Sequence, residues 1–303
     1  MIRSFTDKSK SIKNRTRHKI GYLMLFPSYS IYLLFVLLPV IMTIYYSFTN
    51  YDFYKRIDFI GLRNYYSIFK DPFMLIALRN TVIYSIFVVT IQIVFGLILA
   101  SLLNNKRMTG NKFHRMAIYS PNVTSMVSIS MIWLWLYEPS NGMINTVIKS
   151  LGLKPQKWLF DPNLALFSII VTSIWAYIGY NMILYLAGLQ SIPKSLYEAA
   201  IIDGASSLQQ FFKITIPMLA PITFFLVIMA SIRSFNVFEQ VNVMTQGGPL
   251  NATTTIVHQI YQTAFMKFDM GVASALTVLI LIFTFVFVIL NLKFGNQGHD
   301  LDS

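Results

Sequence analysis

The segment from Ser195 to Pro221, SLYEAAIIDGASSLQQFFKITIPMLAP, places carboxylates and helix-capping residues between two apolar runs. Its two carboxylates, Glu198 and Asp203, are of the type that proteins pair for general acid–base catalysis. No His and no cluster of metal-ligating residues accompanies them in the segment. We therefore predict that both carboxylates make contacts rather than catalyse a reaction, that the chain is not an enzyme and that it has no metal site.

The same segment carries signals for two short helices. Ser195 with Glu198, and Ser206 with Gln209, have the spacing of a capping box. Gly204 is placed to end the first helix in a left-handed turn, and Pro217 separates the second helix from the apolar run that follows. These signals leave two interpretations open, which are a capped connector at the membrane interface and a rigid knob that docks into a partner.

The composition excludes a soluble domain. The 303 residues are 55% hydrophobic and only 12% charged, whereas a soluble domain is about 25% charged. The absence of Cys excludes disulfides and thiolate metal sites. The net charge of +12 does not indicate nucleic-acid binding, because the Lys and Arg residues lie between apolar runs rather than in a patch flanked by aromatic residues.

Six runs without Asp, Glu, Lys or Arg are long enough to cross a bilayer as a helix, which takes ~20 residues. We predict an all-α polytopic membrane protein with a leader at 1–19, a six-span domain at 20–293 and a tail at 294–303. The predicted spans are about 20–47, 80–105, 116–137, 164–190, 215–236 and 270–292.

The positions of Lys and Arg predict the orientation of these spans. The leader is rich in both, and so is the short connection between the second and third spans, which contains Lys106, Arg107, Lys112 and Arg115. This bias places the N-terminus, the loop at 191–217 and the C-terminus on the cytoplasmic side.

The residues of the loop at 191–217 resemble a known signature. Glu198-Ala199-Ala200, Gly204, Ile214 and Pro217 match the spacing of the EAA motif of ATP-binding-cassette importer permeases, EAA-x3-G-x9-I-x-L-P, with Ile216 at the usual Leu. The stretches FIGLRNYYSIFKDP and NVMTQGGPLNATTTIVHQIYQTAF are similar to the first permease of maltose-type importers of the carbohydrate-uptake group. The resemblance extends from about Lys19 to Phe294 and implies the type I importer permease fold.

That resemblance implies a function in the bacterial cytoplasmic membrane. The chain would translocate a sugar or oligosaccharide that an extracellular binding protein delivers, together with a second homologous permease and in contact with membrane lipid, but not with nucleic acid. Two ATPase subunits would bind ATP and Mg²⁺, so this subunit itself would hold no cofactor, which agrees with its lack of a phosphate-binding P-loop motif. The residues implied in coupling to the ATPase are Glu198, Ala199, Ala200, Asp203, Gly204, Ile214 and Pro217.

The resemblance also implies a substrate path through the fourth and fifth spans. Sugar sites combine aromatic faces with hydroxyl or amide groups, and the aromatic residues here have an alternative role in helix packing or in the interfacial belt. The candidate residues are Trp175, Tyr177, Tyr180, Asn181, Ala230, Arg233, Ser234 and Val237.

Arg233 departs from the maltose-type pattern, which has an uncharged residue there. A charge at the centre of a span costs about 2.5–3.5 kcal/mol on insertion scales. Arg233 either lies near the outer interface, pairing with Glu239 or snorkelling, or it meets the carboxylate of an acidic sugar of the uronate or sialate type. An ion-coupled secondary transporter is a weaker alternative, because it needs carboxylates or His chains within the membrane and none of the six runs contains Asp or Glu.

Overall fold

A computed structural model of the chain describes residues 24–52, 57–104 and 110–295. In these ranges the chain is helical, and its one β feature is an isolated bridge between Thr49 and Phe59. The predicted leader at 1–19 and residues 296–303 of the predicted tail lie outside the described residues.

The described helices vary from single turns to long segments able to cross a membrane. The α-helices are α2 (Leu38–Tyr46), α3 (Arg63–Lys70), α4 (Pro72–Leu103), α5 (Asn111–Tyr119), α6 (Met126–Leu136), α7 (Met143–Ser150), α8 (Ala165–Ser191), α9 (Lys194–Ile202), α10 (Ser207–Gln210), α11 (Ile216–Met218), α12 (Ala220–Phe235), α13 (Glu239–Met244), α14 (Ile256–Tyr261) and α15 (Met270–Gly295). The 3₁₀ segments are Ser120–Val123 and Trp158–Phe160, and the π segments are Leu33–Leu37, Phe211–Thr215 and Gln262–Met266.

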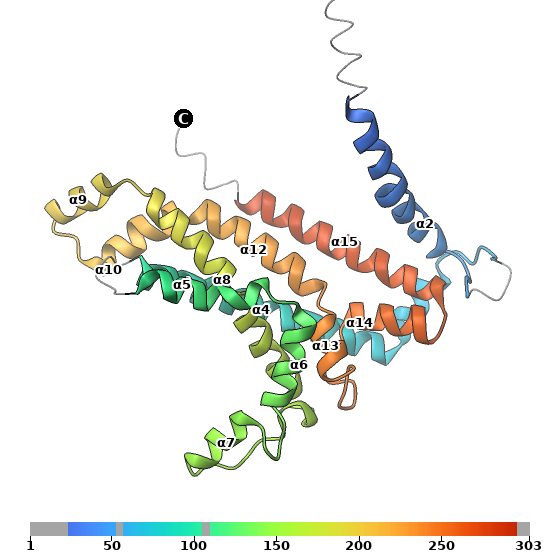
Figure 1. The fold of residues 1–303 in the computed structure, drawn as a ribbon. Coiled ribbons are helices and arrows are strands. Elements are labelled where there is room, and N and C mark those ends of the chain that lie inside the picture. The colour runs from blue at the N-terminus through green and yellow to red at the C-terminus, as the bar shows by residue number, and fades with distance from the viewer. Residues whose placement is uncertain (1–23, 53–56, 105–109, 296–303) are drawn as a thin grey trace, which may run out of the picture.

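Four long helices, α4, α8, α12 and α15, form an elongated bundle (Figure 1). The helix pair with the most extensive packing is α4 with α8, and α12 packs against both α4 and α15. The helices α9 and α10 lie at one end of the bundle, and α13 and α14 lie toward the other (Figure 1). The bundle therefore has a short-helix cap at each end.

Glycine allows the close contacts of α8 with its neighbours. A Cβ at Gly96 of α4 would lie 2.9 Å from the Cβ of Asn181 on α8. A Cβ at Gly179 of α8 would collide with the backbone oxygen of Ile118 on α5. Two backbones approach this closely only where one side chain is missing, as in small-residue packing between membrane helices.

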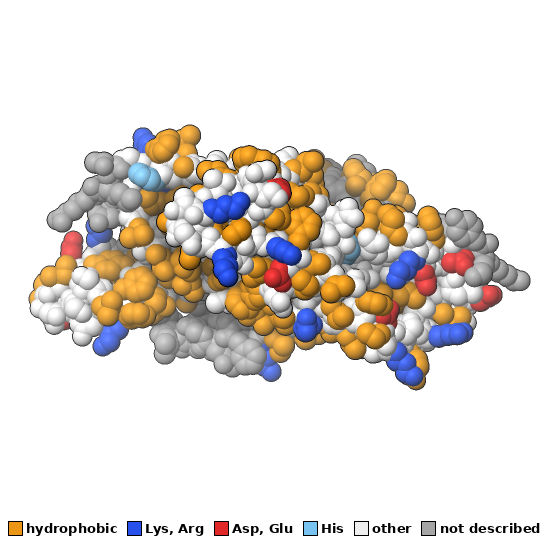
Figure 2. Space-filling view, turned by 90° about the horizontal axis from the view of Figure 1, so that it is seen from below, with side chains coloured by type: hydrophobic (Ala, Val, Ile, Leu, Met, Phe, Trp, Pro, Cys, Tyr) orange, Lys and Arg blue, Asp and Glu red, His pale blue; other side chains and the backbone are white. Residues whose placement is uncertain are grey.

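Five helical segments are long and apolar enough to cross a membrane in the part of the chain that the structure describes, and they are Met24–Tyr46, Pro72–Leu103, Ala165–Ser191, Ala220–Met244 and Met270–Lys293. Hydrophobic side chains cover much of the face seen in Figure 2. The predicted third span at 116–137 is not one continuous helix. It breaks at Pro121, which has no N–H to donate, and Thr124 is extended before the shorter apolar helix α6 begins. The count of six spans therefore stays a prediction.

The loop before α14 is held against the start of α4. The amide of Asn80 donates to the backbone oxygens of Asn251 and Thr254, and the hydroxyl of Thr81 accepts from the backbone N–H of Ile256. His258 is buried beneath this loop, where desolvation lowers its pKa. The loop is thus a fixed part of this end of the bundle.

The close contact at Gly179 predicts a loss of stability when it is filled. Replacing Gly179→Val should destabilise the protein by about 1–3 kcal/mol, because overpacking forces the backbone of α5 away. The matched control is Ala187→Val on the exposed face of the same helix, which should leave stability unchanged. Thermal unfolding of the purified protein in detergent measures both, and equal melting temperatures for the two variants would contradict the packing described here.

Candidate functional site

The predicted coupling loop, residues 191–217, begins with a helix that starts earlier than its capping signal predicted. Ile192 is extended before Pro193, as the residue before a proline prefers, and α9 begins at Lys194 with Pro193 as its N-cap. No side chain caps this N-terminus. The predicted capping box of Ser195 with Glu198 is therefore wrong, because the proline starts the helix before Ser195 reaches a capping position.

The end of α9 has the turn that the sequence predicted. Gly204 has a φ of +77°, in the left-handed region, and the N–H of Ala205 donates to the oxygen of Ala200 at 2.9 Å. The N–H of Gly204 donates to Ile201, which completes a Schellman motif. The second capping box is confirmed, since Ser206 and Gln209 exchange side-chain to backbone hydrogen bonds of 3.3 and 2.8 Å.

The predicted coupling loop projects from one end of the bundle (Figure 1). Glu198, Ala199, Asp203 and Gly204 are exposed, and Ala200 is half-buried. Of the two later coupling residues, Ile214 packs against the core between α8 and α12, whereas Pro217 is exposed. The predicted coupling residues therefore include an exposed tip and an anchored base.

One hydrogen bond ties the segment to the helix that follows. The hydroxyls of Tyr197 on α9 and Thr215, just before α11, are 2.9 Å apart. Thr215 is buried and Tyr197 is half-buried, so the bond lies partly inside the protein. This contact fixes α9 relative to the base of α12.

The exposed apolar side chains of this tip were missed from the sequence. Ile201, Ile202 and Leu208 are 64%, 86% and 70% exposed. The sequence did contain a signal for them. Ile201 and Ile202 stand next to Asp203 at the end of a short helix that belongs to no membrane span, so they have no core in which to be buried. Large exposed apolar groups of this kind mark contact surfaces.

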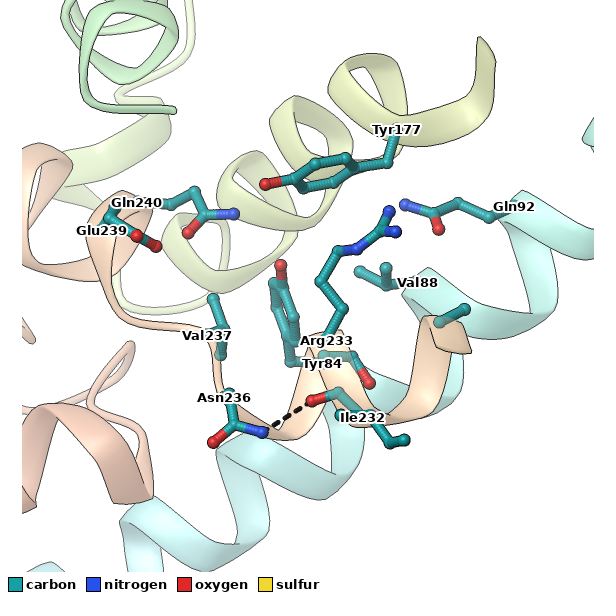
Figure 3. Close-up of a pocket in the computed structure, with 12 residues that line it drawn as sticks. Tyr84, Val88, Gln92, Tyr177, Ile232, Arg233, Asn236, Val237, Glu239 and Gln240 are labelled. Atoms are coloured by element: carbon teal, nitrogen blue, oxygen red, sulfur yellow. Dashed lines mark hydrogen bonds between the residues drawn. The ribbon is translucent and has the colours of Figure 1, made fainter. Parts of the chain in front are cut away.

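A cavity of about 290 Å³ lies between α4, α8, α12 and α13 (Figure 3). Its α12 residues are in the last two turns of that helix. The cavity therefore lies away from the N-terminal end of α12, which is the end closer to α9. Its lining residues are Tyr84, Val88, Gln92, Tyr177, Ala230, Ile232, Arg233, Ser234, Asn236, Val237, Glu239 and Gln240. The cavity thus combines aromatic faces, three carboxamides, a cation and a carboxylate.

Arg233 points across the cavity toward α4 and α8. Its guanidinium carbon is 4.4 Å from the ring centroid of Tyr177 and 5.2 Å from that of Tyr180. The guanidinium approaches Gln92 and points away from Glu239 (Figure 3). The expected pairing with Glu239 is therefore not formed, because the side chain instead lies along the faces of two tyrosines, a favourable cation–π arrangement.

Two buried carboxamides meet at Ser173 of α8. Gln92 donates to the backbone oxygen of Ser173 at 3.2 Å, and Gln240 donates to its hydroxyl at 3.2 Å. The side-chain oxygen of Gln240 is buried and accepts no hydrogen bond. Since a buried polar atom without a partner is costly, this oxygen is suited to receive a donor from a ligand.

The residues predicted for the substrate path divide into five that line this cavity and three that do not. Tyr177, Ala230, Arg233, Ser234 and Val237 line the cavity, whereas Trp175, Tyr180 and Asn181 do not. Trp175 packs edge-on against Trp133 with ring centroids 5.7 Å apart. Asn181 is buried against Gly96, and its side-chain nitrogen has no hydrogen-bond partner.

The side of the cavity formed by α4 was missed in the sequence. Tyr84, Val88 and Gln92 share one face of that helix, at spacings of four residues. Gln92 was the available signal, because it is a carboxamide in the middle of the apolar run 80–105. A strongly polar side chain at that depth faces the interior of a bundle.

Residues 92–295 match the family model described as "Binding-protein-dependent transport system inner membrane component". The chain is 34% identical to the trehalose/maltose transport system permease protein MalF of Thermococcus litoralis, over 93% of this chain and 95% of the relative. It is 31% identical to the sn-glycerol-3-phosphate transport system permease protein UgpA of Yersinia pestis, over 91% and 93%. It also superposes with a TM-score of 0.84 and 24% identity on a chain of a bacterial ABC transporter involved in import of the acidic polysaccharide alginate, covering 95% and 99% of the two chains. This likeness shows the type I importer permease fold.

The cavity predicts a difference in thiol labelling that the chain's lack of Cys makes simple to measure. Cys placed at Tyr177 on the cavity wall should react with a small water-soluble maleimide about tenfold faster than Cys placed at Thr172, because a thiol needs solvent access to react. Thr172 is fully buried on the same helix. Equal rates in detergent-purified protein would show that water does not reach the cavity.

Proposed function

The chain belongs to the family of binding-protein-dependent transport system inner membrane components, and we propose a transport mechanism for it on that basis. It is a permease subunit of a sugar-importing ATP-binding-cassette transporter. A binding protein delivers a sugar or oligosaccharide from outside the cell. Two separate ATPase subunits, which bind ATP and Mg²⁺, drive its passage between this permease and a second, homologous one. The loop that contains α9 faces the cytoplasm of a bacterial cell, as the positions of Lys and Arg favour.

The observation that carries this proposal is the exposed tip from Glu198 to Leu208, which contains a Schellman turn at Gly204 and a capping box at Ser206. A part that receives a push must not deform, and the Schellman turn together with the capping box at Ser206 makes the tip rigid. Its exposed apolar and acidic groups fit a cleft in an ATPase subunit, where Glu198 would accept hydrogen bonds or pair with a cation. The small side chains of Ala199 and Ala200 allow close approach.

A continuous set of contacts leads from this tip to the cavity. Tyr197 binds Thr215 at the base of α12, and Leu219, at the junction of α11 and α12, is buried. A Cβ at Gly188 of α8 would collide with Ile222 of α12, so the two helices are in close contact there. Displacement of α9 would therefore move α12, and with it Arg233 in the cavity wall.

The cavity is suited to a sugar ring. The rings of Tyr84 and Tyr177 offer faces for apolar C–H groups, while Gln240, Ser234 and Glu239 offer hydrogen-bond partners for hydroxyls. A volume of about 290 Å³ is at the small end of the range for ligand pockets. One sugar unit, rather than a whole oligosaccharide, would occupy it at a time.

Coupling through α9 predicts that Glu198→Lys and Gly204→Pro each lower uptake by about tenfold or more, since removing one partner of a charged contact costs several kcal/mol and proline cannot adopt a positive φ. Uptake into cells or proteoliposomes measures the effect, with the amount of membrane-inserted protein determined in parallel. The control is Ser195→Ala, a change at an exposed residue on the same helix that caps nothing. Uptake at the control's level in both variants would contradict the coupling role.

An acidic sugar is the second candidate substrate, and Arg233 is the observation that favours it. Its guanidinium lines the cavity with no carboxylate paired to it among the described residues. Family membership leaves both classes open, because one relative is named for trehalose and maltose and another for the anion glycerol 3-phosphate. A uronate or sialate carboxylate would meet Arg233 beside Tyr177.

If the substrate is acidic, Arg233→Ala should lower transport of a uronate-bearing sugar by about tenfold or more, the loss expected for a charge-assisted hydrogen bond, and should leave transport of a neutral sugar nearly unchanged. Arg233→Lys should retain part of the activity. The matched control is Arg79→Ala on the exposed face of α4. Equal losses for acidic and neutral sugars, or no loss, would contradict an acidic substrate.

A further inference from the structure

Two adjoining cavities lie near the N-terminal ends of α4 and α15, at the opposite end of the bundle from α9. The apolar cavity, of about 190 Å³, lies between α3, α4, α14 and α15 and includes Phe69, Leu75, Leu279 and Phe283. The polar cavity has about 280 Å³. The two share Ile68 and Met74 in their walls, so a polar and an apolar cavity adjoin at these two side chains.

The polar cavity contains one cation and two carboxylates. Asp71 and Asp269 each use one oxygen to cap a helix, accepting from the N–H of Phe73 at 2.8 Å and of Val272 at 3.0 Å. Lys267 lines the same cavity and forms no ion pair with any described residue. The site thus presents an unpaired ammonium group and two carboxylates to a single ligand.

The wall of the polar cavity contains a buried hydroxyl, that of Thr263, without a hydrogen-bond partner. The residue is 2% exposed and lines the cavity, yet its hydroxyl has no hydrogen-bond partner. It lies in the π segment Gln262–Met266, and such segments are frequent at functional sites. A buried hydroxyl of this kind is satisfied when a ligand atom reaches it.

The depth of the two cavities matches that of one lipid leaflet. Asp71 and Asp269 precede two helices able to span the membrane, so the polar cavity is at the level of the headgroups. The apolar cavity continues along α15 as far as Phe283. From Val272 to Phe283 a helix rises about 16 Å, close to half of the ~30 Å hydrocarbon core.

We propose that this site binds a phospholipid with a phosphoethanolamine headgroup from the leaflet opposite the α9 loop. Lys267 binds the phosphate, Thr263 donates its hydroxyl to a phosphate oxygen, and Asp71 and Asp269 accept from the primary ammonium group. One acyl chain occupies the apolar cavity. Anionic lipids are disfavoured by the two carboxylates, and a trimethylammonium group has no N–H to donate to them.

The test is native mass spectrometry of the complete transporter, exchanged into mixed phosphatidylethanolamine and phosphatidylglycerol and then transferred to detergent. Wild type should retain phosphatidylethanolamine in preference to phosphatidylglycerol. Lys267→Glu and Leu279→Trp, which fills the apolar cavity, should each lower that retention by about fivefold. The matched controls are Lys154→Glu on an exposed loop and Leu292→Trp on the exposed face of α15, and both should retain the lipid as wild type does.

A milder variant keeps the proposal falsifiable if the larger substitutions disturb folding. Asp269→Asn still offers an oxygen to cap α15 but removes a negative charge, so the preference should shift toward phosphatidylglycerol. An unchanged preference in this variant would overturn the proposal, as would equal lipid retention in Lys267→Glu and wild type. If Leu279→Trp separates the two permeases without changing lipid retention, the groove is a subunit interface and the proposal is wrong.

Discussion

The close packing of α4 against α8 is the constraint on which the rest of the structure depends. Lipid offers no hydrogen-bond partners, so polar groups inside the bundle must find theirs between helices. Gly96 lets α4 approach Asn181 on α8, and at this separation Gln92 reaches the backbone of Ser173. Ser173 in turn binds Gln240. One helix contact therefore places the polar wall of the cavity.

The second requirement is that motion at one end of the bundle reaches that cavity. The tip at α9 is rigid because a Schellman turn ends α9 and a capping box starts α10, and Tyr197 of α9 is tied to Thr215, which precedes α11. The cavity end of α12 is interrupted, since the helix stops at Phe235 and a short break precedes α13. Arg233 lies two residues before that stop, where a shift of α12 would change its position over Tyr177 and Tyr180. In the proposed transport cycle, displacement of the rigid tip moves α12 and therefore changes the cavity wall.

Local sequence chemistry predicted the elements well where neighbouring residues decide the structure. Gly204 and the capping box at Ser206 are confirmed because they depend on a few adjacent residues. The capping box at Ser195 failed because Pro193 started the helix earlier. The α4 wall of the cavity at Gln92 could not be placed from one sequence. A helix that is apolar all round has no single apolar stripe, so which of its sides faces the cavity depends on the helices packed against it.

The central claim is that the tip of α9 sits in a cleft of an ATPase subunit and follows its motion. The most direct measurement places a photo-crosslinking amino acid at Ile202, which is 86% exposed, in the complete transporter. The account predicts a cross-link to the ATPase subunit whose yield changes between the nucleotide-free and ATP-bound states. Cross-links only to lipid or to the extracellular binding protein would contradict it.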